Sequence, residues 1–347
     1  MNADFRSDTL TQATPDMRTA MASATVGDDV YGEDPTVNEL QERIAALTGK
    51  ESALFCTSGT QSNLSAVLSH GQRGDEYLIG ENYHILLNEV SGASALGGMS
   101  PWPIKVDETG GINPADVISA IKEPDQHHPI TNLLCLENTV NGFVQPVELI
   151  SELAEAAHKS GLSVHLDGAR LFNAAVALNV PVSSFTKSVD TVSLCLSKGL
   201  GAPVGSVLAG SKETINKAFR IRKMLGGGTR QAGHLAAAGL YALDHHIERL
   251  VEDHLRAEQI AKGLSGIAGL EVKQTSNMLW VTPLPELHAG LSKHLEEKNV
   301  KVIPWSPTMR IVTHLDIDDS HVDYLVQVFQ DFFSDLVSTA RAARRYA

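Results

Sequence analysis

The sequence predicts an α/β fold in which helices cover both faces of a mostly parallel sheet. Short apolar runs bounded by glycine or turn residues alternate with longer helical runs through the middle of the chain, as in repeated βα units. The chain has 347 residues, more than one hydrophobic core usually organises, so a second domain is expected. The runs that we interpret as strands of the large domain are 53–56, 76–79, 133–137, 162–166, 191–196 and 204–209.

Three regions follow from this pattern. Residues 1–50 are predicted to form an N-terminal arm and a helix, which begins with Asp34 as the N-cap and Pro35 as the first helical residue. Residues 51–243 are predicted to form the large domain, and residues 244–347 a small α+β domain. The segments that indicate the small domain are a long helical stretch over 235–264, followed by shorter segments at 270–273, 278–281, 286–297, 310–312 and 321–333.

Charge and composition exclude several classes of partner. The chain carries 41 Asp and Glu against 28 Lys and Arg, which disfavours nucleic acid and anionic membranes. It has no run of about 20 apolar residues and no basic and apolar leader, so we expect a cytoplasmic protein. Cys56, Cys135 and Cys195 each lie in an apolar run, which predicts buried, reduced cysteines.

The strongest chemical signal is a carboxylate and a lysine at the ends of two predicted strands. Asp167 ends the run before Gly168, and Lys198 follows the run 191–196. Ligands of open α/β sheets collect at the carboxyl ends of strands. An aspartate there can keep the ring nitrogen of pyridoxal phosphate protonated, and a lysine can condense with its aldehyde. Taken singly, Asp167 could instead cap a helix, and Lys198 could be a solvated loop lysine.

A third element precedes these two in the chain. The segment FCTSGTQSN, residues 55–63, joins an apolar strand to a helix through Ser58, Gly59 and Thr60. A helix N-terminus offers unpaired amides and a positive dipole end, which bind phosphate. Such a turn is by itself most often a plain helix cap. Together with Asp167 and Lys198 it predicts a phosphate site for the same cofactor.

Several longer motifs resemble one known family. The sequence is similar to the low-specificity L-threonine aldolases, members of the aspartate aminotransferase superfamily with the fold type I of pyridoxal phosphate enzymes. The resemblance covers nearly the whole chain and implies that fold, that cofactor and an aldehyde-lyase. The motifs that carry it are FRSDT at 5–9, VGDDVYGEDP at 26–35, SGTQSN at 58–63, LENT at 136–139, HLDGARLFNA at 165–174, LSKGLGAPVGS at 196–206, LGGGTRQAG at 225–233 and MRIVTH at 309–314.

The resemblance assigns two candidate catalytic histidines. His84 matches a histidine that stacks on the cofactor ring, and His127 matches one that contacts the substrate hydroxyl, ten residues before Glu137. Either histidine could accept the hydroxyl proton, and spacing alone does not choose between them. We expect no metal, because no further ligands stand at zinc-like spacing around His127 and His128.

Further residues receive binding roles from the resemblance. Arg170 and Arg310 are expected to hold the substrate carboxylate together with Ser7, since arginine binds a carboxylate through two donors. Arg170 is also expected near the cofactor. A surface salt bridge is the alternative for either arginine.

A second group is expected to be shared between subunits. Tyr31, Lys223 and Arg230 match residues that line the pocket or reach the phosphate from a neighbouring subunit. The resemblance therefore implies a homo-oligomer, specifically a homotetramer built as a dimer of dimers. The glycine run 226–228 could equally be a flexible turn.

The expected reaction is cleavage of L-threonine or L-allo-threonine to glycine and acetaldehyde, with longer β-hydroxy-α-amino acids also accepted. The alternatives are a β-eliminating lyase, an amino-acid racemase or a catalytically silent homologue, since the superfamily reuses the same residues. Asn88, Val140 and Asn132 replace residues common in the family. We expect these three to surround the substrate side chain and to affect its preference.

Overall fold

The computed structural model describes residues 1–346 and divides them into two compact units. One unit comprises residues 13–247, and the other comprises residues 1–12 together with the residues from 248 onward. These boundaries differ from the predicted ones. Residues 13–50 join the larger unit because the two helices in this segment pack on other elements of that unit. Residues 1–12 join the smaller unit because their strand pairs within it.

The larger unit is built on a seven-stranded sheet with the order β2-β8-β7-β6-β5-β3-β4. The strands from β7 to β4 run parallel, whereas β8 is antiparallel to both of its neighbours. The predicted mostly parallel sheet is therefore confirmed. Its strands are β2 (Ser52–Cys56), β3 (Glu76–Gly80), β4 (Ser100–Ile104), β5 (Thr131–Glu137), β6 (Ser163–Gly168), β7 (Thr191–Cys195) and β8 (Ser206–Gly210).

The edge strand β4 was not predicted from the sequence. Pro101 and Pro103 lie inside it, and proline argues against a strand because it lacks a backbone donor. The strand pairs with β3 on one side only, and the Ser100 amide points inward to bond Asp75. The backbone N–H and C=O groups of successive strand residues point alternately to the two sides of the strand. The backbone nitrogens of both prolines therefore face the open side of β4, where the missing N–H prevents pairing with another strand.

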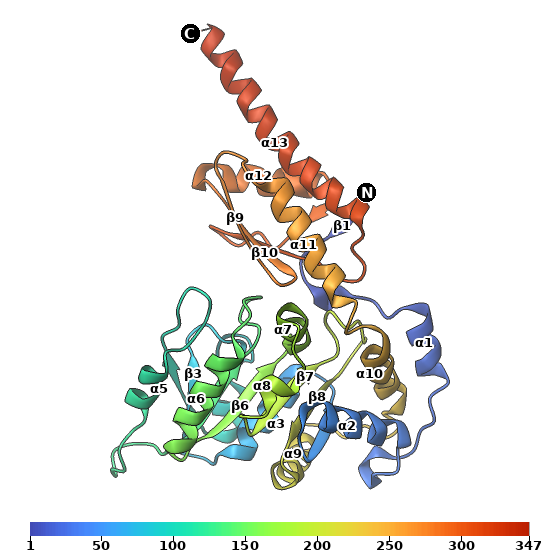
Figure 1. Ribbon diagram of the computed structural model, residues 1–347, viewed down its shortest axis with the longest axis vertical. Helices are drawn as coiled ribbons and strands as arrows, with labels where there is room; N and C mark the ends of the chain where they lie inside the picture. Colours follow the sequence, from blue (N-terminus) through green and yellow to red (C-terminus); the bar gives the residue numbers. More distant parts are fainter. Residues whose placement is uncertain (347) are drawn as a thin grey trace. The chain divides into compact units, whose positions relative to one another are not determined.

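Helices cover both faces of this sheet (Figure 1). Helices α3 and α9 pack together on one side, against β2 and β8, and α6 packs with α8 on the other. The predicted N-cap of α2 is confirmed: Asp34 accepts hydrogen bonds from the amides of Thr36 and Val37 at 3.1 Å. The helices are α1 (Pro15–Ala22), α2 (Pro35–Thr48), α3 (Gly59–His70), α4 (His84–Leu87), α5 (Pro114–Ala120), α6 (Val147–Lys159), α7 (Leu171–Leu178), α8 (Ser183–Thr186), α9 (Lys212–Met224) and α10 (Gly233–His245).

The smaller unit is an α+β structure, as predicted. A three-stranded antiparallel sheet has the order β12-β10-β9, and β1 pairs in parallel with β11. The predicted continuous helical stretch over 235–264 is wrong, because α10 ends at His245 and α11 begins at Leu250. The elements are β1 (Ala3–Asp4), β9 (Leu270–Thr275), β10 (Met278–Pro283), β11 (Val300–Lys301), β12 (Met309–Val312), α11 (Leu250–Leu264), α12 (Pro285–Glu297) and α13 (Asp319–Tyr346).

The strands of the large sheet supply buried apolar side chains to the core. Leu78, Leu134 and Val192 are fully buried in the large sheet. The cysteines Cys56, Cys135 and Cys195 are all free and buried, as predicted. None of the described helices is long and apolar enough to cross a membrane.

Candidate active site

Four neighbouring strands bring their carboxyl ends to one edge of the large sheet. In the order β7, β6, β5 and β3, these ends carry Lys198, Asp167, Glu137 and His84. Asp167 and Glu137 are register partners on adjacent strands. The parallel order thus gathers a lysine, two carboxylates and a histidine that are far apart in the sequence. We call this group, together with Glu89, the carboxyl-edge cluster.

Asp167 is almost completely buried and held by two hydrogen bonds. Its Oδ1 accepts the Ala169 amide at 2.9 Å, and its Oδ2 accepts the Asn63 side-chain amide at 2.9 Å. Burial, followed by the nearby Glu89 carboxylate, raises the pKa of Asp167, and Lys198 opposes this shift. A cationic ligand beside Asp167 would therefore stabilise its ionised form.

His84 begins α4 and is bound on two sides by carboxylates. Its Nδ1 donates to Glu89 Oε1 at 2.9 Å, and its backbone amide donates to Glu137 Oε2 at 2.6 Å. The hydrogen bond to Glu89 raises the pKa of His84. Burial and the neighbouring Asp167 raise the pKa of Glu137 to about 8. Ligand atoms of His84, Glu89 and Asp167 lie within 4.8 Å of one another, and these hydrogen bonds account for that closeness.

The predicted phosphate turn forms the start of α3. Ser58 caps this helix by accepting the Gln61 amide at 3.1 Å, and a Cβ placed on Gly59 would meet no atom within 4 Å. The first amides of a helix, here those of Gly59 and Thr60, have no acceptor within the helix itself. Asn63, which binds Asp167, follows Gly59 by four residues, or about 6 Å along the helix axis.

This arrangement fits pyridoxal phosphate at both ends of its ring. The N-terminus of α3 offers amides for an anion, and Asp167 offers a buried carboxylate for a cation. The cluster contains three acidic side chains, those of Glu89, Glu137 and Asp167, and burial raises the pKa of Glu137 to about 8 and also raises the pKa of Asp167. A protonated ring nitrogen beside Asp167 is a ligand that would favour the ionised form of this carboxyl group.

The glycine run 226–228 packs against the same helix start. A Cβ on Gly227 would lie 2.7 Å from Gln61 Nε2, 2.8 Å from Arg222 Cγ and 3.0 Å from the Arg222 carbonyl oxygen, so a larger residue would require neighbouring atoms to shift. Arg222 supports the loop: it is buried, pairs with Asp29 at 2.9 Å and donates to the Phe55 carbonyl at 2.6 Å. Arg222 was missed in the sequence because a lysine-rich helix end looks solvated. Its burial makes the loop a defined structure rather than a flexible turn.

The residues predicted to be shared between subunits lie around this loop. Arg230 pairs with Asp28 at 2.7 Å, and Tyr31 is 74% exposed. Lys223 lies beside Gly228. All three therefore stand at the surface of the larger unit, and their contact with a second copy stays a prediction.

The substrate-carboxylate residues are divided between the two units. Arg170 directly precedes α7, three residues after Asp167. Arg310 lies on β12 in the smaller unit, donates to the Arg6 carbonyl at 3.1 Å and lies 4.9 Å from the Trp305 ring centre. Ser7, in the same unit, accepts the Thr9 amide at 3.2 Å. Their roles toward the substrate stay predictions.

His127 does not join the carboxyl-edge cluster of its own chain. It precedes β5, is 76% exposed and binds Asp125 at 2.6 Å. The strand from Thr131 to Glu137 spans about 20 Å, so His127 lies at the amino edge of the sheet. Within one chain His127 therefore lies away from the cluster, and its contact with the substrate hydroxyl stays a prediction that would require a second copy.

The same placement corrects part of the predicted side-chain pocket. Asn132, near the start of β5, binds Asp75 at 2.7 Å at the amino edge, so it does not surround the substrate in this chain. Val140 is buried and bridges to Phe143. Asn88 lies next to the cluster, where its amide donates to the His84 carbonyl at 2.8 Å.

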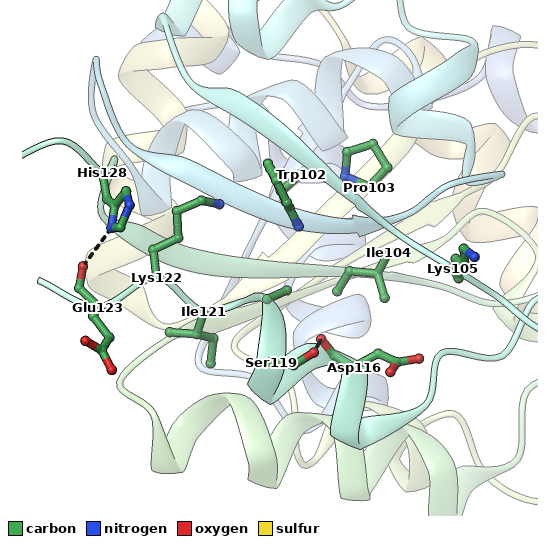
Figure 2. Close-up of a pocket in the computed structure, with 11 residues that line it drawn as sticks. Trp102, Pro103, Ile104, Lys105, Asp116, Ser119, Ile121, Lys122, Glu123 and His128 are labelled. Atoms are coloured by element: carbon green, nitrogen blue, oxygen red, sulfur yellow. Dashed lines mark hydrogen bonds between the residues drawn. The ribbon is translucent and has the colours of Figure 1, made fainter. Parts of the chain in front are cut away.

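A separate surface pocket lies beside β4 and α5. Figure 2 shows Trp102, Lys122 and His128 on its wall, and its volume is about 660 Å³. Lys122 lies 3.6 Å from the Trp102 ring centre and pairs with Glu76 at 2.7 Å. None of the residues that line it belongs to the predicted site, so we place the chemistry at the carboxyl edge.

Comparison with known proteins places the chain in a family. A family model described as beta-eliminating lyase matches residues 4–283. The chain belongs to this family. It is 45% identical over 343 residues to a probable low-specificity L-threonine aldolase 2 from Arabidopsis thaliana, covering 95% of this chain and 97% of that protein. It is 47% identical over 314 residues to a low specificity L-threonine aldolase from Escherichia coli K12, covering 90% and 94%.

Solved structures support the fold. A threonine aldolase from Leishmania major superimposes with a TM-score of 0.83 at 20% identity, covering 95% of this chain and 99% of that one. A putative L-allo-threonine aldolase from Listeria monocytogenes gives a TM-score of 0.76 at 19% identity, covering 95% and 97%. The predicted family, fold class, lyase class and pyridoxal phosphate cofactor are confirmed by these matches.

Proposed function

We infer that this protein is a low-specificity L-threonine aldolase that cleaves L-threonine, L-allo-threonine and related β-hydroxy-α-amino acids to glycine and an aldehyde. The observation that carries this proposal is the carboxyl-edge cluster, with Lys198 and Asp167 on neighbouring parallel strands beside the start of α3. Relatives with this named activity match over at least 90% of the chain. Both the fold and the site chemistry therefore support the same reaction.

Each residue has a defined task in this proposal. Pyridoxal phosphate, when bound, supplies the electron sink that stabilises negative charge on the substrate Cα. Lys198 provides the amine that tethers it, and Asp167 holds its ring nitrogen protonated. Ser58, Gly59 and Thr60 at the start of α3 hold its phosphate.

The proton of the substrate hydroxyl is assigned to His84. Its Nδ1 is occupied by Glu89, so Nε2 is the ring nitrogen available to accept a proton. Arg170 and Arg310 hold the substrate carboxylate, which fixes the bond that breaks. Loss of the hydroxyl proton to His84 then drives release of the aldehyde.

Product analysis tests this proposal. Purified enzyme with the cofactor is incubated with L-threonine, L-allo-threonine and L-serine, and the products are separated. We expect glycine and acetaldehyde from both threonines. Pyruvate or an α-keto acid as the main product would indicate β-elimination, and D-isomers would indicate a racemase. An absence of every product would indicate a silent homologue.

The assembly and location belong to the same proposal. We propose a homotetramer, a dimer of dimers, in which the exposed Tyr31 and Arg230 contact the site of a second copy. Light scattering of the wild type gives the mass, and mixing two inactive variants, Arg230→Ala and Lys198→Ala, tests sharing by recovery of activity. Three buried free cysteines suit a reducing compartment such as the cytoplasm.

A further inference from the structure

Glu89 is a buried carboxylate to which the sequence motifs give no role. Its side chain is 5% exposed, and its Oε1 accepts two hydrogen bonds. One comes from His84 Nδ1 at 2.9 Å, and the other comes from Asn63 Nδ2 at 2.9 Å. It therefore joins a candidate catalytic residue to the residue that also binds Asp167.

The orientation of the Asn63 side-chain amide is fixed by a hydrogen bond with His165. His165 Nε2 lies 3.2 Å from Asn63 Oδ1, and His165 Nδ1 lies 2.9 Å from Thr191 Oγ1. Burial lowers the pKa of His165 to about 3, so its ring is neutral and carries one proton. With that proton on Nε2, His165 donates to the Asn63 oxygen, and both amide hydrogens of Asn63 point at Asp167 and Glu89.

This geometry dictates the tautomer of His84. An ionised carboxylate only accepts hydrogen bonds, so the proton of a neutral His84 ring must reside on Nδ1, facing Glu89. Nε2 is then left as the acceptor. A ring without this partner would divide its proton between the two nitrogens and rotate more freely.

We propose that Glu89 is a positioning residue that holds His84 in the Nδ1-protonated tautomer and in the ring orientation required for proton transfer. The proposal rests on the proposed aldolase function, because it assigns the proton to His84. Glu89 acts through His84 and Asn63 and contacts neither the substrate nor the cofactor.

The surrounding charges and backbone support this role. The groups that face His84 are Asp167 from β6, Glu137 from β5 and Lys198 after β7, and among them Lys198 alone disfavours the protonated ring. The two residues after Glu89 adopt the left-handed region, with φ of 55° at Val90 and 53° at Ser91. The conformation is unfavourable for a β-branched residue, so this turn is held by its surroundings rather than chosen by its sequence.

The test compares Glu89→Gln and Glu89→Asp with the wild type. Glutamine keeps the shape but can no longer dictate the tautomer, and aspartate keeps the charge but is one methylene too short. Asp190→Asn is the matched control, because it breaks another carboxylate–histidine pair, with His158 at 2.8 Å, at the opposite edge of the sheet. Nitrogen chemical shifts of labelled His84, assigned with His84→Asn, report the tautomer and pKa with and without cofactor.

We expect the wild type and Asp190→Asn to show His84 protonated on Nδ1. Glu89→Gln should show mixed tautomers, a lower His84 pKa and a kcat reduced by about 10- to 100-fold, with KM and cofactor affinity changed by less than about threefold. Glu89→Asp should retain more of the His84 pKa shift than Glu89→Gln while losing the defined tautomer.

Two results would overturn the proposal. One is an unchanged His84 tautomer in Glu89→Gln, and the other is a changed tautomer with wild-type kcat and pH profile. If instead the wild type failed to cleave threonine while the tautomer still depended on Glu89, the positioning role would stand and the aldolase function would fail.

Discussion

The amino and carboxyl edges of the large sheet hold their acidic side chains in contrasting ways. At the amino edge, the buried Glu76 is paired with Lys122 at 2.7 Å, and the partly exposed Asp190 accepts hydrogen bonds from His158 and the Val164 amide. At the carboxyl edge, burial raises the pKa of Asp167 and of Glu137. Glu76 is therefore neutralised by a partner within the protein, whereas the ionised form of Asp167 would be stabilised by a cationic ligand.

This contrast indicates which edge of the sheet binds a ligand. A closed ion pair contributes to folding and leaves nothing for a ligand. A buried carboxylate without a cationic partner costs stability and is a candidate for binding a ligand that offsets this cost. Substitutions of residues that bind the cofactor or substrate at the carboxyl edge should therefore affect function, and substitution of Glu76 at the amino edge should affect stability.

The largest effect is expected at Lys198. Lys198→Ala removes the amine that tethers the cofactor, so turnover should fall by roughly 10³-fold or more. Contacts of Asp167 and the α3 start should still hold some cofactor. Steady-state kinetics and absorbance after gel filtration measure both quantities. Near-normal turnover in this variant would refute the assignment.

His84 and His127 distinguish the two edges directly. His84→Asn should lower kcat by about 10²–10⁴-fold, because a positioned base contributes that much. His127→Asn is measured beside it under the same conditions. A loss confined to His84 supports the carboxyl edge of one chain. An equal loss in His127→Asn would mean that a second copy supplies His127 to the site.

Asp167 tests the charge argument itself. Asp167→Ala leaves the buried cationic ring nitrogen without its partner, at a cost of about 3–5 kcal/mol in cofactor binding. The dissociation constant, measured by fluorescence titration, should rise by the corresponding factor of about 10²–10⁴. Wild-type affinity in this variant would show that another group holds the ring nitrogen.

At the amino edge the effect should be structural and smaller. Glu76→Gln breaks the ion pair with Lys122. Because the Glu76 side chain is only 3% exposed, the loss should lower the free energy of unfolding by about 1–3 kcal/mol. The kinetics with L-threonine should stay within about twofold, since Glu76 lies outside the carboxyl-edge cluster. Urea unfolding measures the stability, and initial rates measure the kinetics. A loss of kcat without a loss of stability would contradict the structural role of Glu76.

Glu137 should give the free energy of unfolding a pH dependence. Burial and Asp167 raise the pKa of Glu137 to about 8, above its ordinary 4.5. The folded protein keeps a proton that the unfolded chain releases, so unfolding free energy should fall as pH rises from about 4.5 to about 8. Asp167 acts in the same direction. The slope of the unfolding free energy against pH, measured by urea unfolding of cofactor-free protein, should be shallower in Glu137→Gln. An unchanged slope would mean that another group causes the pH dependence.

Much of the site could be predicted because strand ends are visible in a sequence. Asp167 and Lys198 each follow an apolar run, and parallel pairing alone brings such ends together. Glu89 and Asn63 leave no comparable signal, since their meeting depends on how α3 packs on the face of the sheet. His84 stands five residues before Glu89, and that short spacing was the one available hint.

The errors have physical causes as well. The spacing of ten residues between His127 and Glu137 matched His127 to a family histidine but says nothing of distance, and the extended strand between them separates the two residues within one chain. The strand β4 was missed because its prolines suggest a loop, and only an edge position makes them compatible with a sheet.

Covalent mapping of the cofactor tests the central claim most directly. The holoenzyme is reduced with borohydride, which fixes pyridoxal phosphate on its lysine, and is then digested and analysed by mass spectrometry. The account predicts that the adduct lies on Lys198 and that Asp167→Ala, treated at the same cofactor concentration, gives a lower yield at the same position. An adduct on another lysine such as Lys223, or none in the wild type, would contradict it.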